Sequence, residues 1–495
     1  MFSFPEITSS FYYTAAPVLI LVAGSMVALL QGVSQGFASR RSIEVTAWLT
    51  IFAAIVAAAV IPGEQAEFLA GGLLSGNLAR TGQFAILAIA ACVMMMMREH
   101  HTGASFFRGE VASIFLMLVS GMLVMVSSDD LVTLFVGLEL ASIGLYVILG
   151  YVQPNRRSQE GAIKYFILGS VAAAILLFGF ALLYAATGTM RLSGIVAALP
   201  SIANHGWVRL GALLTLVGLG FKLALVPFHM WAPDAYESAP TGITAFMATT
   251  VKVMILTVAL RLFSGAFSTM SEVWYPAMLI LAVLSMVVGN IMALVQTNLK
   301  RMLAYSSIAH SGYMAVAICA LSTTATGLPI RAILFYLLTY VLVSLGAFAV
   351  VMSLETAEND QLTIDDLSGL AKKRPWLALS MTVFMFSFGG MPPTAGFIGK
   401  FFVFNAALTN HLYGLVFIGI IGSAISLFYY LRLVVRMYMA EPVAPFGALK
   451  PASGGFTLTA AVLAIAVVTT VLLGTILPGE VMERLVDTAT EVARK

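Results

Sequence analysis

Five ionisable residues stand inside long apolar stretches of this sequence: Glu139, Lys222, Lys252, His310 and Lys400. A charge at the centre of a bilayer costs roughly 2.5–3.5 kcal/mol on insertion scales, and residues of this kind mark ion or proton pathways. Desolvation favours the neutral form of a buried lysine, whereas a nearby carboxylate favours its charged form. A group balanced between these effects can take up and release a proton. The sequence therefore predicts a buried path for protons.

Some of these residues also have a structural interpretation. Glu139 and Lys222 could form a static ion pair that fixes helix packing, and the serines beside His310 could simply satisfy its ring. His229 follows Pro227 closely, and a neutral imidazole both accepts and donates a proton. It could equally be a satisfied core or loop histidine. Both interpretations stay open at this point.

Other charged residues lie closer to expected helix ends and have simpler explanations. Asp234 and Glu237 follow a proline-rich interruption, where they either control access to the interior or are solvated loop residues. Long basic side chains near a helix end extend their charge to the membrane surface. The residues that we interpret as such interfacial anchors are Lys164, Arg261, Lys300, Arg301, Arg432 and Arg436.

The composition places these residues in a membrane protein. The chain has 495 residues, of which 60% are hydrophobic and 10% are charged, and its mean hydropathy is +0.97. Soluble proteins carry about 25% charged residues. The net charge of +3 is scattered through short loops, which argues against nucleic-acid binding. No nucleotide motif is present, and Cys92 and Cys319 stand far apart, so we expect no nucleotide, metal or redox cofactor in this chain.

Runs of roughly 20 apolar residues, the length that spans a bilayer, recur along the whole chain. They predict an all-α membrane protein with fourteen transmembrane helices. The expected spans are 14–33, 44–62, 80–97, 111–127, 130–152, 161–187, 208–236, 241–265, 272–296, 302–321, 330–355, 376–409, 412–439 and 455–478.

The seventh and twelfth of these spans are long and interrupted, the seventh by Pro227 and Pro233 and the twelfth by a glycine- and proline-rich stretch, 389–393. Broken helices at matching positions indicate inverted repeats in transporters. We therefore expect helices four to eight and nine to thirteen to be two inverted five-helix units. Chance proline kinks are the alternative. The expected divisions are 1–110, 111–265, 266–440 and 441–495.

Lysine and arginine are unevenly distributed between the loops. The loops after odd-numbered helices hold most of them, including Arg40, Arg98, Arg156 and Lys450. Basic loops stay in the cytoplasm, so both termini are expected on the other side of the membrane. The N-terminus lacks the basic start of a signal peptide, so the first helix should remain in the mature protein.

Three motifs carry a family resemblance. The segments FKLALVPFHMWAPDAYESAPT at 221–241, NLKRMLAYSSIAHSGYM at 298–314 and GGMPPTAGFIGKF at 389–401 resemble the antiporter-like membrane subunits of proton-pumping NADH:quinone oxidoreductase, respiratory complex I. The likeness covers nearly the whole chain. It is closest to the N type, because the M type is expected to carry glutamate in place of Lys400 and the L type extends into a long lateral helix.

This resemblance implies specific roles for residues, partners and cofactors. Glu139, Lys222, Lys252 and Lys400 match the family's hydrated mid-membrane axis, which joins half-channels from the two sides. The neighbours are expected to be an M-type subunit and small K-, J- and A-type subunits. NADH, FMN, iron–sulfur clusters and quinone should be bound by other subunits. A bacterial inner membrane suits the chain length and short tails.

Two other functions fit the same sequence. Related subunits serve multi-subunit sodium/proton antiporters, and exchange that depends on sodium without NADH would indicate that function. A structural membrane subunit, whose buried charges only fix helix packing, is the second alternative. It predicts that charge-removing variants disrupt assembly, while any complex that does assemble is fully active.

Overall fold

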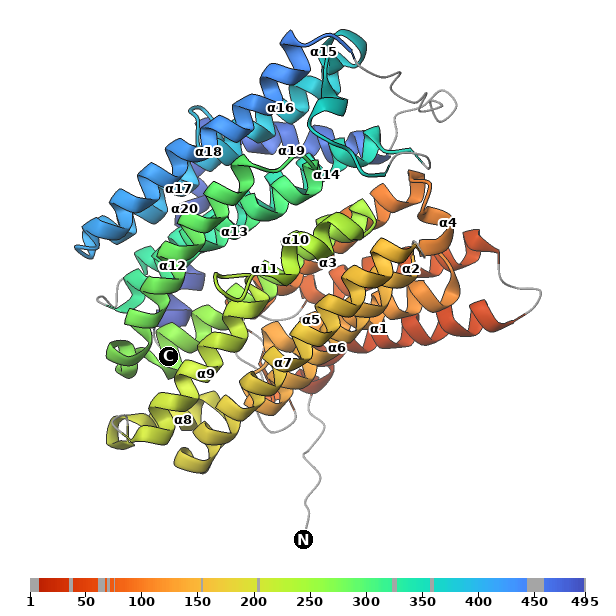
Figure 1. Ribbon diagram of the computed structural model, residues 1–495. Coiled ribbons are helices and arrows are strands. Elements are labelled where there is room, and N and C mark those ends of the chain that lie inside the picture. Colours follow the sequence, from red (N-terminus) through yellow and green to blue (C-terminus); the bar gives the residue numbers. More distant parts are fainter. Residues whose placement is uncertain are drawn as a thin grey trace.

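The computed structural model consists of long helices that run side by side through one bundle (Figure 1). It describes residues 9–34, 39–60, 67–68, 72–74, 76–152, 155–202, 205–322, 327–356, 360–442 and 458–493. A two-residue hairpin, Glu67–Phe68 (β1) with Leu73–Leu74 (β2), interrupts the helical pattern. The predicted all-α membrane fold is confirmed apart from this hairpin. Lys450, residues 61–62 and residues 455–457, named in the predictions, lie outside the described residues.

Twelve helical segments in the described part of the chain are long and apolar enough to cross a membrane. Each overlaps one of the predicted spans. Their helices are α1 (Ser9–Val33), α2 (Arg40–Val60), α3 (Asn77–Glu99), α5 (Gly109–Ser127), α6 (Leu131–Tyr151), α7 (Arg156–Thr187), α11 (Thr241–Arg261), α12 (Ser271–Leu294), α13 (Leu299–Cys319), α14 (Leu328–Leu354), α18 (Tyr413–Met439) and α19 (Leu458–Thr475). Short turns extend three of them: η1 (Leu262–Ala266), η2 (Ser268–Met270) and η3 (Ala320–Ser322).

The predicted seventh and twelfth spans are each a pair of shorter helices. The first pair is α9 (Gly206–Lys222) and α10 (Trp231–Ser238), and the second is α16 (Pro375–Gly389) and α17 (Ala395–Thr409). We call the segments between them the first break and the second break. Proline lacks the backbone donor that a helix interior needs, and Gly390 at the second break has a φ of +76°, which favours glycine. The count of fourteen crossings stays a prediction.

Local sequence signals explain where several of these helices begin. Asp130 Oδ1 accepts hydrogen bonds from the first-turn amides of α6, and the Asn155 side chain does the same for α7. The Asn298 side chain caps α13 by accepting from Arg301 N at 3.0 Å. Each of these caps satisfies an amide that has no partner inside the helix.

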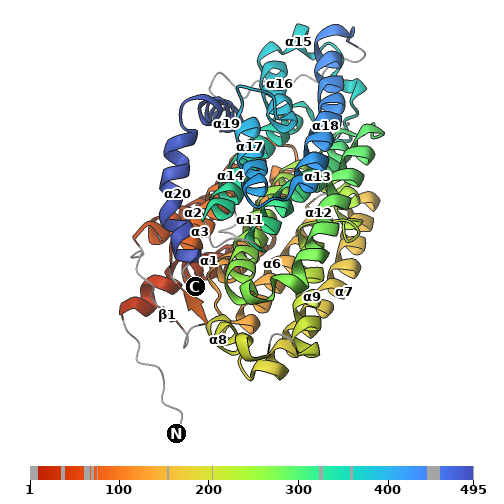
Figure 2. The same cartoon turned by 90° about the vertical axis from the view of Figure 1, so that its left-hand side faces the viewer.

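The structure contains short helices that the sequence did not predict. They are α4 (Gly103–Phe106), α8 (Leu192–Ile202), α15 (Leu370–Lys373), the turn η4 (Asp365–Leu367) and the C-terminal α20 (Pro478–Ala493). Helix α20 exposes Glu483 and Asp487 and buries Met482 and Ala489. It lies against α3 and α14 on the flank of the bundle (Figure 2). The region predicted as a tail therefore forms an amphipathic helix.

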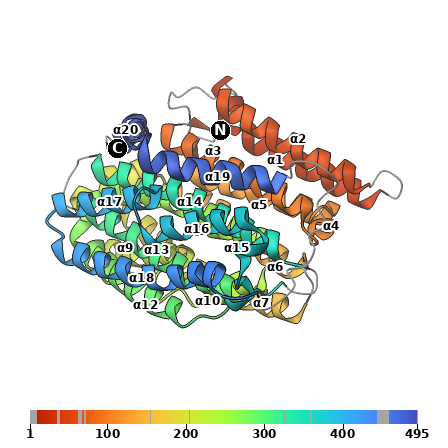
Figure 3. The ribbon, with the colours of Figure 1, turned by 90° about the horizontal axis from the view of Figure 1, so that it is seen from above.

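The centre of the bundle is formed by α11 and α13, whose spanning segments are buried throughout, with α14 beside them. Viewed from above, α1 and α2 lie at one edge and α12 and α18 at the opposite edge (Figure 3). A helix that is apolar all round is expected to be buried. The two central helices carry Lys252 and His310, so these residues lie at the core of the molecule.

Candidate functional site

The first predicted lysine, Lys222, is the last residue of α9 and is 4% exposed. Its ammonium donates hydrogen bonds to Ser142 Oγ at 2.7 Å and to Tyr146 OH at 3.2 Å, both on α6. The ring of Tyr165 on α7 lies 5.6 Å from Lys222 Nζ. At the break itself, Trp231 Nε1 donates to the carbonyl of Phe221 at 2.8 Å and so satisfies a backbone group there. Polar and aromatic side chains from three helices thus surround a buried cation.

Glu139 lies on the same helix as these partners, three residues before Ser142. Its carboxylate is not the group that holds Lys222, because the ammonium donates to Ser142 and Tyr146. Glu139 Oε1 is buried and has no hydrogen-bond partner among the described residues. A buried acceptor without a partner is costly. Glu139 and Ser142 are three residues apart on α6 and so share one face of that helix, but it is Ser142 that accepts from the Lys222 ammonium.

Lys252 is linked to the first break by a serine of α13. Its ammonium donates to the carbonyl of Ser307 at 3.1 Å and also to Ser311 Oγ. Ser311 Oγ in turn donates to the carbonyl of Leu223 at 2.7 Å, the residue that follows Lys222. A single serine therefore joins the helix α11 lysine to the backbone beside the α9 lysine.

His310 is held between tyrosines rather than by the neighbouring serines. Its Nδ1 pairs with Tyr336 OH at 2.7 Å and its Nε2 with Tyr430 OH at 3.2 Å. The ring of Tyr340 lies 5.3 Å from Lys252 Nζ and 5.4 Å from the His310 ring. A small cavity beside His310 has room for roughly one water molecule.

Lys400 lies on α17 just after the second break. Its ammonium donates to the carbonyls of Phe388 at 2.9 Å and Gly389 at 3.3 Å and to Ser423 Oγ at 2.8 Å. The Phe388 ring also lies 5.1 Å from the His310 ring, so Phe388, near the end of α16, contacts both Lys400 and His310. A cavity of about 400 Å³ between α17 and α18 reaches Lys400.

Together these contacts connect Lys222, Lys252, His310 and Lys400 across the core, and we call the four residues with Glu139 the polar axis. His229 is not in contact with the other predicted groups. Its ring is half-buried at the first break, 6.5 Å from the Tyr305 ring, and its Nδ1 has no hydrogen-bond partner in the described part of the chain.

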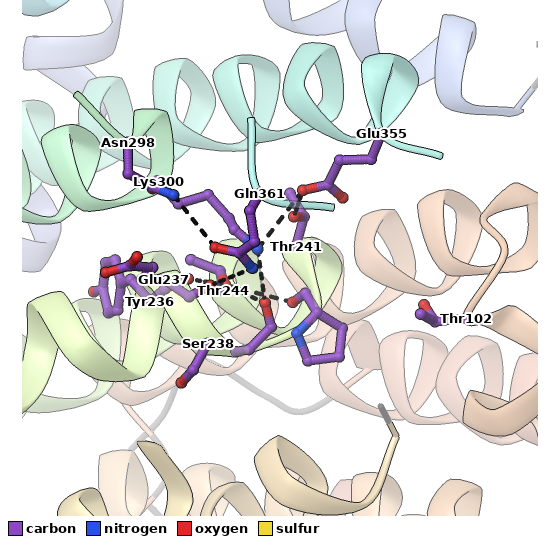
Figure 4. A network of polar contacts seen from close by, with 12 residues as sticks. Thr102, Tyr236, Glu237, Ser238, Thr241, Thr244, Asn298, Lys300, Glu355 and Gln361 are labelled. Atoms are coloured by element: carbon purple, nitrogen blue, oxygen red, sulfur yellow. Dashed lines mark hydrogen bonds and ion pairs between the residues drawn. The ribbon is translucent and has the colours of Figure 1, made fainter. Parts of the chain in front are cut away.

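A second buried charged cluster joins the ends of several helices, and the sequence did not predict it. Figure 4 shows Lys300 and Glu355 directed toward Thr241. Lys300 Nζ lies 3.7 Å from Glu355 Oε1 and donates to the carbonyl of Ala239 at 3.1 Å. Thr241 Oγ1 donates to Glu355 Oε1 at 2.5 Å. His100 Nε2 lies 3.2 Å from Glu355 Oε2 but is not aligned for a hydrogen bond.

The position of Lys300 corrects the sequence-based interpretation. We expected an interfacial anchor, but the Lys300 side chain is only 3% exposed and its partner Glu355 is 1% exposed. Burial alone would raise the pKa of Glu355. Lys300, His100 and Thr241 outweigh burial and hold this pKa below its usual range. The carboxylate therefore stays charged and ties α11, α13 and α14 together at one end of the bundle.

Asp234 and Glu237 are engaged in ion pairs rather than being free loop groups. Arg301 Nη1 lies 2.6 Å from Asp234 Oδ1 and 2.9 Å from Glu237 Oε2. Lys164 lies 3.1 Å from the other oxygen of Asp234. These side chains are about one-third exposed or more, so the pairs are screened by solvent and each contributes little to stability.

Sequence reasoning missed Glu355, His100 and the tyrosine partners of His310. His100 and Glu355 follow the last residues of α3 and α14, and helix ends are normally solvated, so only the meeting of α3, α11, α13 and α14 reveals the cluster. Lys300 itself gave no separate signal, because it is the second residue of α13 and is followed directly by Arg301. Among the described residues, no group of three histidine, cysteine or acidic side chains could hold a metal ion.

The sequence of this chain matches a known protein family and several of its members. Residues 128–426 match the family model described as NADH:quinone oxidoreductase/Mrp antiporter, transmembrane. The chain is 42% identical to NADH-quinone oxidoreductase subunit N of Trichlorobacter lovleyi over 427 residues, covering 85% of this chain and 86% of the relative. It is 38% identical to the subunit N of Paramagnetospirillum magneticum over 457 residues, 91% and 92% of the two chains.

A solved structure gives the same result. A chain of respiratory complex I from Thermus thermophilus with bound aureothin superposes with a TM-score of 0.78 at 33% identity, over 94% of this chain and 98% of that one. A chain of the Mrp complex from Dietzia superposes with a TM-score of 0.80 at 20% identity, over 98% and 96%, which shows a shared fold. The family resemblance predicted from the three motifs is confirmed.

Proposed function

Because this chain belongs to the family of NADH:quinone oxidoreductase and Mrp antiporter membrane proteins, we propose that it moves protons along its polar axis as a subunit of NADH:quinone oxidoreductase. Its relatives at 38–42% identity are N-type subunits of that enzyme. The observation that carries the proposal is the series of buried contacts that runs from the Leu223 carbonyl, beside Lys222, through Ser311 and Lys252 to His310 and Lys400.

In this proposal, Lys222 is the first proton carrier. Its ammonium is held by Ser142 and Tyr146, and the unpaired Glu139 carboxylate lies one turn away on the same helix. Quinone reduction elsewhere in the complex changes the local field. The ammonium then moves between the hydroxyl partners and Glu139. When the Lys222 side chain lies close to Glu139, the carboxylate stabilises its charged form. When it lies away from Glu139, the neutral form is favoured, because burial disfavours charge. This movement makes the proton available to the next group.

The later steps follow the contacts across the core. The proton passes over water from Lys222 to Lys252, whose Ser311 partner already reaches the backbone beside Lys222. His310 accepts and donates through its two ring nitrogens, both of which face tyrosine hydroxyls. Lys400 receives the proton and releases it toward the cavity between α17 and α18. His229, half-buried at the first break, is a candidate for passing protons between its surroundings and Lys222.

The two breaks support an inverted repeat of 111–265 and 266–440, flanked by 1–110 and 441–495. A buried lysine lies beside each break, Lys222 before the first and Lys400 after the second, and broken helices at matching positions are typical of inverted repeats. We place the chain in the bacterial inner membrane, with both termini outside the cytoplasm. Figure 3 supports the side of the membrane that we assign to the C-terminus. The C-terminus lies at one end of the bundle, and α4, whose neighbouring segments carry arginines, lies at the opposite end.

We also propose the neighbours of this chain and the location of the redox groups. The membrane partners are an M-type antiporter-like subunit and the small K-, J- and A-type subunits, because respiratory complex I provides a matching structure over 94% of the chain. NADH, FMN, iron–sulfur clusters and quinone bind to other subunits. The lysines of the polar axis donate hydrogen bonds to hydroxyls and carbonyls, an arrangement suited to proton transfer.

The decisive experiment measures NADH-driven proton uptake by inverted membrane vesicles from cells that carry Lys222→Ala. Wild type and Lys372→Ala, an exposed lysine paired with Glu441, serve as controls at matched complex levels. Loss of pumping and of coupled turnover in Lys222→Ala alone supports the proposal. Undiminished pumping would contradict it.

The same vesicles separate the two alternative functions. The family model also covers Mrp antiporters, so sodium-dependent exchange in the absence of NADH would assign the chain to an antiporter complex. A structural subunit would behave differently again. In that case the amount of assembled complex would fall in Lys222→Ala, while the activity per assembled complex would equal that of wild type.

A further inference from the structure

Three arginines lie close together where α2 begins and α3 ends. Arg40 and Arg41 open α2, Arg98 is in the last turn of α3, and all three line one cavity of about 740 Å³. Arg40 Nη2 donates to the carbonyl of Arg98 at 3.1 Å, which fixes the two segments together. We call this cavity with its arginines the arginine pocket.

The pocket carries excess positive charge. Its one carboxylate, Glu44, lies 2.7 Å from Arg98 Nε, and the ion pairs in the described part of the chain include neither Arg40 nor Arg41. Other basic residues in loops of the same predicted side are differently placed, since Lys372 pairs with Glu441 and Arg436 with Asp365. Two exposed guanidinium groups are therefore available to an anion from outside this chain, and guanidinium matches phosphate with two parallel hydrogen bonds.

An apolar stripe leads away from the pocket along α2. Val45, Leu49, Phe52 and Val56 are 48%, 63%, 64% and 45% exposed, and their spacing of four, three and four residues puts them on one face of the helix. From Val45 to Val56 the helix rises about 16 Å. That length is close to one leaflet of the hydrocarbon core, about 15 Å. Figure 3 places α2 at the edge of the bundle, and the exposed fractions of these four side chains show that nothing in the described part of the chain covers this face.

We propose that the arginine pocket binds the phosphate of an anionic phospholipid, whose acyl chain lies along the α2 stripe. Charge complementarity selects the headgroup, because basic pockets between helices at the cytoplasmic side attract anionic lipids. Trp48, half-buried in the lining of the pocket, is a residue type enriched at the headgroup level. The bound lipid lies against α2 and α3 and is separate from the polar axis.

The test uses the intact membrane complex in nanodiscs made of equal parts phosphatidylglycerol and phosphatidylcholine. Leu49→p-benzoylphenylalanine provides a photo-crosslinker on the stripe, and mass spectrometry identifies the attached molecule. We expect phosphatidylglycerol to be captured several-fold more often than phosphatidylcholine. Removing a basic residue from a membrane-surface site weakens lipid attraction by about fivefold. Arg40→Gln with Arg41→Gln should therefore bring the ratio close to that of the disc.

Matched controls distinguish this site from general charge effects. Arg156→Gln with Arg157→Gln removes the same charge from the start of α7, on the same predicted side, and should leave the preference intact. Arg41→Gln alone provides a milder variant in case the double change prevents assembly, and it should give an intermediate ratio.

Three results would overturn the proposal. Capture of another protein chain at Leu49 would mean that a partner subunit covers the stripe. Equal capture of the two lipids would remove the role of the arginines. A preference that excess inorganic phosphate abolishes at constant ionic strength would assign the pocket to a soluble anion instead of a lipid.

Discussion

The two broken helices hold their lysines in different ways. Lys222 precedes the first break and donates only to side-chain hydroxyls of α6, within a shell of aromatic rings. Lys400 follows the second break and donates to the carbonyls of Phe388 and Gly389 that the break itself exposes. The groups that stabilise Lys222 can change with the position of a neighbouring helix, whereas two of the three groups that stabilise Lys400 are carbonyls at the end of α16, and only the third, Ser423 Oγ, comes from α18.

The surroundings of the two lysines differ as well. A cavity of about 400 Å³ reaches Lys400, with the exposed Phe397, Phe401 and Ile420 near its opening. Lys222 is enclosed by α6, α7 and the first break. From this comparison we propose a division of tasks along one axis, in which Lys222 responds to changes in its partners and Lys400 exchanges protons with the outside of the bundle.

The largest expected effect is a difference in chemical rescue. Lys222→Ala and Lys400→Ala should each lower the proton-pumping rate by about 100-fold, the lower end of what a positioned acid–base group contributes. Ethylamine should restore pumping to Lys400→Ala, because the cavity admits a small amine, and should fail with Lys222→Ala. NADH-driven proton uptake by vesicles with and without ethylamine measures this. Equal rescue of both variants would remove the distinction between an open and an enclosed lysine.

A second expected difference concerns the ties that hold each half in place. Glu355 is buried and joins Thr241, at the start of α11, to Lys300 on α13. Glu441 instead pairs with Lys372 on the protein surface. Glu355→Gln should destabilise the protein by about 3 kcal/mol, since it leaves Lys300 buried without its counter-charge. Glu441→Gln should cost less than about 1 kcal/mol. Thermal unfolding of the two variants in detergent measures both changes.

The pH dependence of the Glu355 effect has a defined sign. The pKa of this carboxyl is lower in the folded protein than its ordinary value of 4.5, so its contribution to stability is complete above that value. The contribution is lost as the pH falls through the folded pKa. Wild type and Glu355→Gln should therefore differ most near pH 7 and converge in acid below about pH 4.5. If the difference in stability between wild type and Glu355→Gln were constant across this pH range, the ion pair would not be its cause.

The smallest expected difference lies in the serine partners of the two lysines. Ser142→Ala leaves Lys222 with Tyr146 alone and should slow pumping roughly tenfold, equivalent to about 1.4 kcal/mol. Ser423→Ala leaves Lys400 with two carbonyls, so about a twofold change or less is expected. Steady-state pumping rates at matched complex levels separate the two. A larger loss in Ser423→Ala would reverse the assignment of the more dependent lysine.

The sequence was most informative where a residue conflicts with its surroundings. Prolines and glycines inside apolar runs located both breaks, and charged residues in those runs located the polar axis. The partners of these groups could not be predicted. Tyr336 and Tyr430 contact His310 from α14 and α18, and such contacts depend on how helices distant in sequence pack. Because α20 is amphipathic rather than uniformly apolar, a search for membrane-spanning runs passed over it.

The C-terminal α20 has a mechanical consequence for the whole molecule. With α19 it forms a strap that lies on α3 and α14, and Gly474 near the end of α19 packs directly on the backbone of Pro393 and Thr394 at the second break. Transporters that work by rocking need two bodies that separate freely. Here the strap fastens an early helix to the later half of the chain. Such a strap resists a rocking separation of the two halves, and we propose that transport uses small local displacements inside the bundle.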